Sequence, residues 1–137
     1  MLSAHRQPAQ ATIEVALVIP GLLLGLFLLA AVGLVARADA EVAGVAVEAA
    51  RAGALVASAA DAEPAAIDRA RAVASAYGMT LQRLEVAVDA SDFRRGGEVR
   101  VQARYALPLA SLPLIGWGRV QLHHEAVEPV DAFRSLR

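Results

Sequence analysis

The chain has 137 residues, 57% of them hydrophobic, and a formal net charge of −1 from 13 basic and 14 acidic side chains. So balanced a charge argues against a nucleic-acid partner, which normally requires a basic stripe. The absence of cysteine excludes disulfides, thiolate metal sites and a thiol nucleophile. A domain formed by this chain must therefore be held together by packing.

A short polar leader, residues 1–9, precedes a long apolar run. The segment from Val15 to Ala36 carries no charge, and at ~1.5 Å per residue it would form a helix about 33 Å long, enough to cross a hydrocarbon core of roughly 30 Å. We therefore predict a single transmembrane helix over 10–36 in the plasma membrane. Long C-terminal domains translocate largely regardless of flanking charge, so we expect a cytoplasmic N-terminus and an extracytoplasmic domain over 37–137.

A cleaved signal peptide is the alternative interpretation of this run. Ala38-Asp39-Ala40 matches an A-x-A cleavage pattern, which would release a secreted domain after Ala40. Two features argue against it: the apolar stretch exceeds the usual ~7–15 residues, and Arg6 is the only basic side chain before it.

The apolar run contains features that suit contact with other helices. Glu14 lies directly before it, and a carboxylate at the edge of a span is a functional-site hypothesis by default. Gly21 and Gly25 form a G-x-x-x-G motif that lets a second helix approach closely, although glycine is common in such segments. Pro20 removes one backbone N–H and is expected to bend or loosen the helix.

We expect the same helix to leave the membrane and continue as an amphipathic spine over 37–58. Its small apolar residues recur at spacings of four and three: Val42, Ala46, Ala49, Gly53 and Val56. Its charged residues gather on the opposite face: Arg37, Glu41, Glu48 and Arg51. The segment 61–64 is expected to break the helix, with Pro64 opening a second helix over 64–77 and Gly78 ending it.

After Gly78 the apolar period changes from helical to two. Alternation predicts strands over about 80–89, 98–107 and 119–127, separated by a turn at 91–97 and a connection at 108–118. Three strands with one apolar face need a cover, which the spine can supply. The predicted fold is α+β, a long N-terminal helix packed on a three-stranded antiparallel sheet.

The sequence gives little indication of an enzyme, and we expect no catalytic residues, no cofactor and no metal. His123 and His124 are adjacent in a predicted strand, so they point to opposite faces and cannot hold one ion together. Neither a nucleophile elbow nor a phosphate loop is present.

The connection between the last two strands is more apolar than a plain loop requires. Its large side chains are Leu112, Leu114, Ile115 and Trp117. Either they fold back to close a small core, or they form a partner-docking patch anchored by Trp117.

The N-terminal stretch Ala11-Thr12-Ile13-Glu14-Val15-Ala16-Leu17-Val18-Ile19-Pro20 resembles the opening motif of TadE-like proteins of the tight-adherence (Flp) pilus system. Three further stretches are similar to that family: Val47-Glu48-Ala49-Ala50-Arg51-Ala52-Gly53-Ala54, Phe93-Arg94-Arg95-Gly96-Gly97 and Ala126-Val127-Glu128-Pro129-Val130-Asp131. The resemblance implies a pilin-like fold and a minor pilin-like subunit or assembly factor that acts in pilus assembly, secretion and cell adhesion.

The resemblance also implies processing by a membrane prepilin peptidase. The cut would fall between Ala9 and Gln10, leaving Glu14 fifth in the mature chain, although the family normally has glycine where this chain has Ala9. The expected partners are the membrane, other pilin-like subunits and the pilus assembly machinery. The alternative is a permanently anchored single-span protein whose outer domain binds a protein partner.

Overall fold

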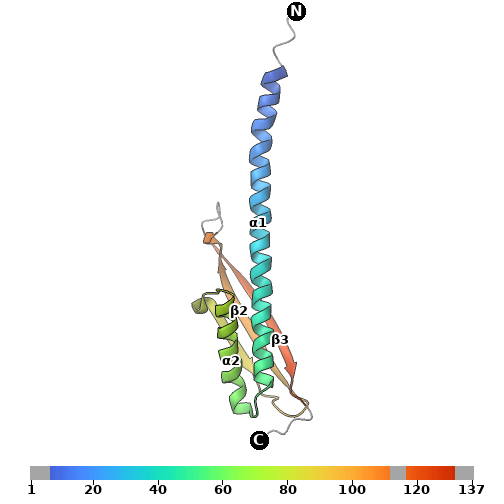
Figure 1. Ribbon diagram of the computed structural model, residues 1–137, viewed down its shortest axis with the longest axis vertical. Coiled ribbons are helices and arrows are strands. Elements are labelled where there is room, and N and C mark those ends of the chain that lie inside the picture. Colours follow the sequence, from blue (N-terminus) through green and yellow to red (C-terminus); the bar gives the residue numbers. More distant parts are fainter. Residues whose placement is uncertain (1–6, 112–116, 132–137) are drawn as a thin grey trace, which may run out of the picture. The chain divides into compact units, whose positions relative to one another are not determined.

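The computed structural model describes the backbone of residues 7–111 and 117–131, and the side chains of residues 16, 18–110 and 117–131. In chain order its main elements are helices α1 (Gln7–Ala54) and α2 (Ala59–Ala76) and strands β1 (Leu84–Asp89), β2 (Glu98–Pro108) and β3 (Arg119–Pro129) (Figure 1). Short 3-10 helices precede β1 and follow β2, at Leu81–Arg83 and Leu109–Ser111. The architecture is α+β, as the sequence predicts.

The chain divides into two compact units, Met1–Leu34 and Val35–Arg137. The first contains the N-terminal part of α1. The second, called the head domain below, contains the C-terminal part of α1 together with α2 and the sheet. This boundary falls two residues before the predicted one, Ala36/Arg37.

The three strands form an antiparallel meander in the order β1-β2-β3. Leu84 pairs with Tyr105 and Val88 with Val101 in the first ladder, and His124 pairs with Ala103 in the second. Burial alternates along β2, where the side chains of the inner face are fully or almost fully buried: Val99, Val101, Ala103 and Tyr105. The period-two prediction is confirmed for the inner face of β2.

Both helices of the head domain contribute small residues to the core. On α1 the buried positions include four of the five in the predicted stripe: Val42, Ala46, Ala49 and Gly53. On α2 they are alanines at every fourth residue: Ala62, Ala66, Ala70 and Ala74. Short side chains let the helices lie close to each other and to the sheet, so the core is thin and rich in alanine.

The position of the break between the helices differs from the prediction. The break lies at 55–58, α2 begins at Ala59, and Pro64 lies inside α2 instead of at its first turn. Ser58 has extended backbone angles at the N-cap, and its hydroxyl donates a 2.6 Å hydrogen bond to Asp61 Oδ2. Ser58 stands at the N-cap position, where serine is favoured, but its hydroxyl bonds the Asp61 carboxylate and no backbone N–H. The prediction gave Pro64 too much weight.

The other boundaries need smaller corrections. α1 begins at Gln7 instead of Gln10, because Pro8 is compatible with a first helical turn, where its missing N–H would have no partner. α2 ends at Ala76, one residue before the predicted end, and Gly78 is the predicted stop. Gly78 has φ +73°, and Met79 N–H donates to Ala74 O at 2.9 Å, which is a Schellman motif. β1 begins at Leu84, later than predicted, because Leu81–Arg83 forms a 3-10 turn.

Candidate membrane anchor and head-domain surfaces

The N-terminal part of α1 contains a segment that is long and apolar enough to cross a membrane. Among the residues that the structure describes, the candidate span is Val18–Ala54, and none of its most apolar part is buried. Every side chain from Val18 to Ala30 is exposed. A core helix of a soluble domain would bury one face, so this pattern is typical of a helix whose partner is lipid or another helix.

The G-x-x-x-G motif lies on this exposed segment. A Cβ atom added at Gly21 or Gly25 would meet no atom within 4 Å, and the same is true of Gly33. The helix continues through Pro20, so the proline does not end it. No described residue of the chain requires glycine at these positions.

The predicted processing and pairing residues lie at the start of α1. The backbone of Ala9, Gln10 and Glu14 belongs to this helix, and their side chains lie outside the described residues. The roles expected for them therefore stay predictions.

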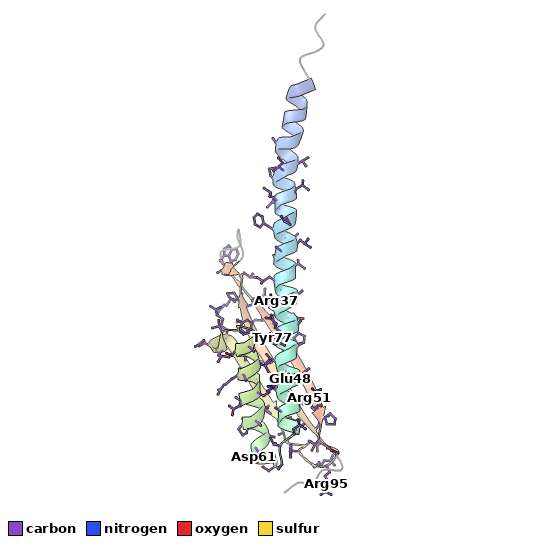
Figure 2. The ribbon with its side chains drawn as sticks, viewed as in Figure 1. Arg37, Glu48, Arg51, Asp61, Tyr77 and Arg95 are labelled. Carbon is purple, nitrogen blue, oxygen red and sulfur yellow. The ribbon has the colours of Figure 1, made fainter. Side chains whose placement is uncertain are left out.

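A charged cluster ties the two helices of the head domain together. Arg69 on α2 donates two hydrogen bonds to Glu48 Oε2 on α1, from Nε at 3.2 Å and from Nη2 at 2.6 Å. Arg51 lies one turn further along α1, with its Nη1 atom 3.9 Å from Glu48 Oε1 (Figure 2). The hydrogen bonds from Arg69 hold the pKa of Glu48 below its ordinary value of 4.5. Glu48 and Arg51 thus lie on the charged face that the sequence predicts.

Gly53 is a position at which α1 packs tightly against its neighbours. A Cβ atom there would lie 3.1 Å from Val99 Cγ1, 3.2 Å from Ala62 O and 3.3 Å from Ala66 Cβ. Three elements, α1, α2 and β2, therefore meet at this one position. Glycine allows an approach that a larger residue would prevent.

The two adjacent histidines point to opposite faces of the sheet, as predicted. His124 Nε2 lies 2.9 Å from Asp39 Oδ1 of α1, on the helix-covered face. His123 lies on the open face, in one cross-strand row with Arg104 and Glu85. Among the residues that the structure describes, no group of three or more histidines and carboxylates could hold a metal ion.

Trp117 lies at the tip of the β2–β3 hairpin. Leu109 N–H donates to Gly118 O at 3.1 Å, and Gly118 has φ +106°, so this pair closes the base of the tip. The Trp117 side chain is 85% exposed, so the core alternative is wrong for this residue. The other predicted patch residues, Leu112, Leu114 and Ile115, lie outside the described residues.

Sequence reasoning missed the Glu48–Arg69 tie and the Asp39–His124 contact. The partners are 21 and 85 residues apart, and a local pattern carries no signal for such pairs. Comparison of the chain with protein-family models, with curated proteins and with solved structures gave no match. Function must therefore be inferred from the residues themselves.

Proposed function

We propose that this protein is a minor pilin-like subunit or assembly factor of a tight-adherence pilus, anchored in the plasma membrane by α1. In this proposal the N-terminus is cytoplasmic, the head domain is extracytoplasmic, and other pilin-like subunits bind the exposed part of α1. The protein has no catalytic role; its function is to present one helix to the membrane and one head domain to partners.

One observation carries the proposal: a single helix has two different surfaces along its length. From Val18 to Ala30 all of its side chains are exposed and mostly apolar, whereas Val42, Val45 and Ala49 are fully buried against the head-domain core. A helix of this kind suits a subunit that is held in lipid or in a helical bundle at one end and carries a folded domain at the other.

The position of the A-x-A motif favours an anchored protein over a secreted one. Ala38 is 6% exposed and belongs to the head-domain core, and Asp39 contacts His124. Both residues lie inside α1, which continues to Ala54. Cleavage after Ala40 would cut a helix within the domain and remove both contacts, so a release site there is a poor fit.

In the proposed assembly Glu14 pairs with a neighbouring subunit. A carboxylate at the edge of a span is stabilised when a positive group, such as the new amino terminus of an adjacent subunit, lies beside it. The open surface around Gly21 and Gly25 gives the neighbouring helix room to approach. Glu14 and the glycine motif together would then define the assembly face of α1.

The test is the recovery of partner subunits with a Glu14→Gln variant. The variant should insert normally, because losing a charge at the edge of a span favours partitioning, and it should recover fewer pilin-like subunits from detergent extracts. Glu63→Gln, an exposed acid on α2, is the matched control. Wild-type recovery with Glu14→Gln would contradict the proposed role of the carboxylate.

A further inference from the structure

The sheet of the head domain has two edges, one along β1 and one along β3. The strand order β1-β2-β3 places β2 in the centre, so each outer strand is paired on one side only. Within the described part of the chain, the backbone of residues 85–89 and 119–129 forms no hydrogen bond to any segment except β2. Unpaired N–H and C=O groups along such edges can pair with a strand of another chain.

The hydrogen bonds at the end of β3 show which of its backbone groups face outward. Val130 N–H donates to Gly97 O at 2.8 Å, and Gly96 N–H donates to Val130 O at 3.1 Å. Because the direction alternates along a strand, the even-numbered residues of β3 bond to β2 and the odd-numbered residues face the free edge. Pro129, which has no N–H, occupies one of these outward positions, where a sheet tolerates proline.

The same alternation identifies the outward backbone groups of β1. The odd-numbered residues of β2 bond to β3, so its even-numbered residues, such as Gln102, bond to β1. Gln102 pairs with Ala87, which places the backbone groups of Ala87 toward β2. The N–H and C=O groups of its neighbours, Val86 and Val88, therefore face the free edge.

The two edges carry complementary side chains on the open face of the sheet. The exposed side chains of β1 on this face include Glu85 and Asp89, whereas those in the first half of β3 include Arg119 and His123. Glu85 and Arg119 form no ion pair within the part of the chain that the structure describes. The edge of β1 is thus acidic, and the first half of the β3 edge is basic.

One parallel register between β1 of one copy and β3 of the next matches these side chains. With Glu85 opposite Arg119, Asp89 lies opposite His123 on the open face. On the helix-covered face the same register pairs apolar side chains with each other: Val86 with Val120, and Val88 with Leu122. A shift by two residues would place Asp89 opposite Glu125, and like charges directly opposite are destabilising.

The outward backbone groups fit this register as well. In a parallel ladder, each outward residue of one strand bonds to the two residues that flank its opposite number. Val86, opposite Val120, would donate its N–H to the carbonyl of Arg119 and accept a hydrogen bond from the N–H of Gln121. Val88 would repeat the pattern with Gln121 and His123.

Parallel pairing of different edges also keeps every copy in the same orientation. α1 lies on the sheet, where Asp39 contacts His124 and Gly53 approaches Val99. Antiparallel pairing of two β3 edges would relate the copies by a two-fold axis normal to the sheet and would reverse the direction of α1 in one of them. Pairing of β1 with β3 leaves that direction unchanged, as copies anchored in one membrane require.

We propose that the head domains of this protein associate edge to edge, with β1 of one copy adding to β3 of the next. The partner is a second copy of this chain. The contact uses a different surface on each side, so it is heterologous and can repeat along a row of copies. This inference rests on the proposed function, because anchoring in one membrane favours the parallel arrangement.

The test introduces cysteine pairs, since the chain contains no cysteine. In the proposed register Ala87 lies opposite Gln121 of the next copy, and both side chains are exposed and uncharged. Within one copy β2 separates β1 from β3 by about 10 Å, too far for a disulfide. The full-length variant Ala87→Cys/Gln121→Cys, reconstituted in phosphatidylcholine vesicles and oxidised, should give a ladder of dimers, trimers and larger species. A variant that stays monomeric would overturn the inference.

Two control pairs test the register and the symmetry of the contact. In Ala87→Cys/Val127→Cys the second cysteine lies six strand residues further along β3, about 20 Å from its position in the first variant, so no ladder should form. Equal ladders from the two variants would overturn the proposed register. Dimers from Gln121→Cys/Val127→Cys, with no ladder from the first variant, would indicate an antiparallel pair of β3 edges and would also overturn the inference.

A charge reversal and a flotation assay complete the test. On the background of the first cysteine pair, Arg119→Glu should lower the crosslinked yield about two- to fivefold, because it turns an attractive cross-strand pair into a repulsive one. Arg71→Glu, an exposed position on α2, is the matched control and should leave the yield unchanged. Equal yields in both would overturn the register. Vesicles that float with the chain but show no ladder refute the strand pairing alone, whereas a ladder from a chain that does not float supports the pairing and refutes the anchor.

Discussion

At the scale of single residues, glycine determines how closely α1 packs in the head domain. Gly53 and Gly44 both lie on α1, but they face different neighbours. Gly53 faces a backbone carbonyl and two short core side chains, whereas Gly44 faces the tip of the Tyr77 ring, with its hydroxyl 3.1 Å from an added Cβ. Tyr77 is 45% exposed and has room to move, and the neighbours of Gly53 have none.

We therefore predict different costs in stability for the same substitution at these two positions. Gly53→Val should destabilise the head domain by about 1–3 kcal/mol, because overpacking forces backbone shifts. Gly44→Val should change stability by less than about 0.5 kcal/mol. Thermal unfolding of the full chain in one detergent would show a midpoint lower by several degrees for the first variant only. Equal midpoints for the two variants would contradict tight, unyielding packing at Gly53.

The Glu48–Arg69 tie predicts a pH dependence with a definite sign. The pKa of Glu48 is lowered in the folded protein, so its contribution to stability is present above the ordinary value of 4.5 and is lost as the pH falls through the lower folded value. The midpoint difference between wild type and Glu48→Gln should therefore shrink on acidification. Arg51→Gln, which leaves the two Arg69 hydrogen bonds in place, is the control. A difference that grows at low pH would contradict this assignment.

At the scale of elements, the N-terminal part of α1 has glycines whose open side no described residue of the chain contacts. Gly21→Leu/Gly25→Leu should leave expression and membrane insertion intact, since nothing lies within 4 Å of either position and leucine favours both helix and lipid. The double variant should weaken crosslinking to neighbouring helices in membranes. Gly33→Leu, equally open but outside the motif, is the control, and equal crosslinking in all three proteins would remove the motif from the account.

The elements also show which parts of the fold could be predicted from the sequence. Strands β2 and β3 follow directly from period-two alternation, and the apolar run in α1 follows from length and charge. The break between the helices is predicted too late because Pro64 was assigned to the first turn of the second helix, whereas α2 begins at Ala59 and holds Pro64 in its interior. Pairs such as Asp39 and His124 could not be predicted, because they depend on how α1 lies across the sheet.

At the scale of the whole molecule, the central claim is that this is an anchored pilin-like subunit. The three interpretations of the chain are a processed pilin-like subunit, a permanently anchored protein and a secreted domain. They differ in where the mature chain begins, because a prepilin peptidase, no protease and a signal peptidase leave different N-termini. Ala9 stands where glycine is usual before a prepilin cut, and alanine is the smallest change from glycine. Ala9 is therefore the residue at which the sequence departs from the pattern that the proposed processing requires.

The most direct measurement is the intact mass of the protein recovered from both the membranes and the medium of cells that contain a prepilin peptidase. Loss of residues 1–9, leaving Gln10 at the N-terminus, is the result that the proposal predicts, and cells without the peptidase should give the full chain. A full-length mass in both cells would contradict processing and leave a permanently anchored envelope protein. A mass that corresponds to a chain beginning at Glu41 would contradict anchoring by α1 altogether.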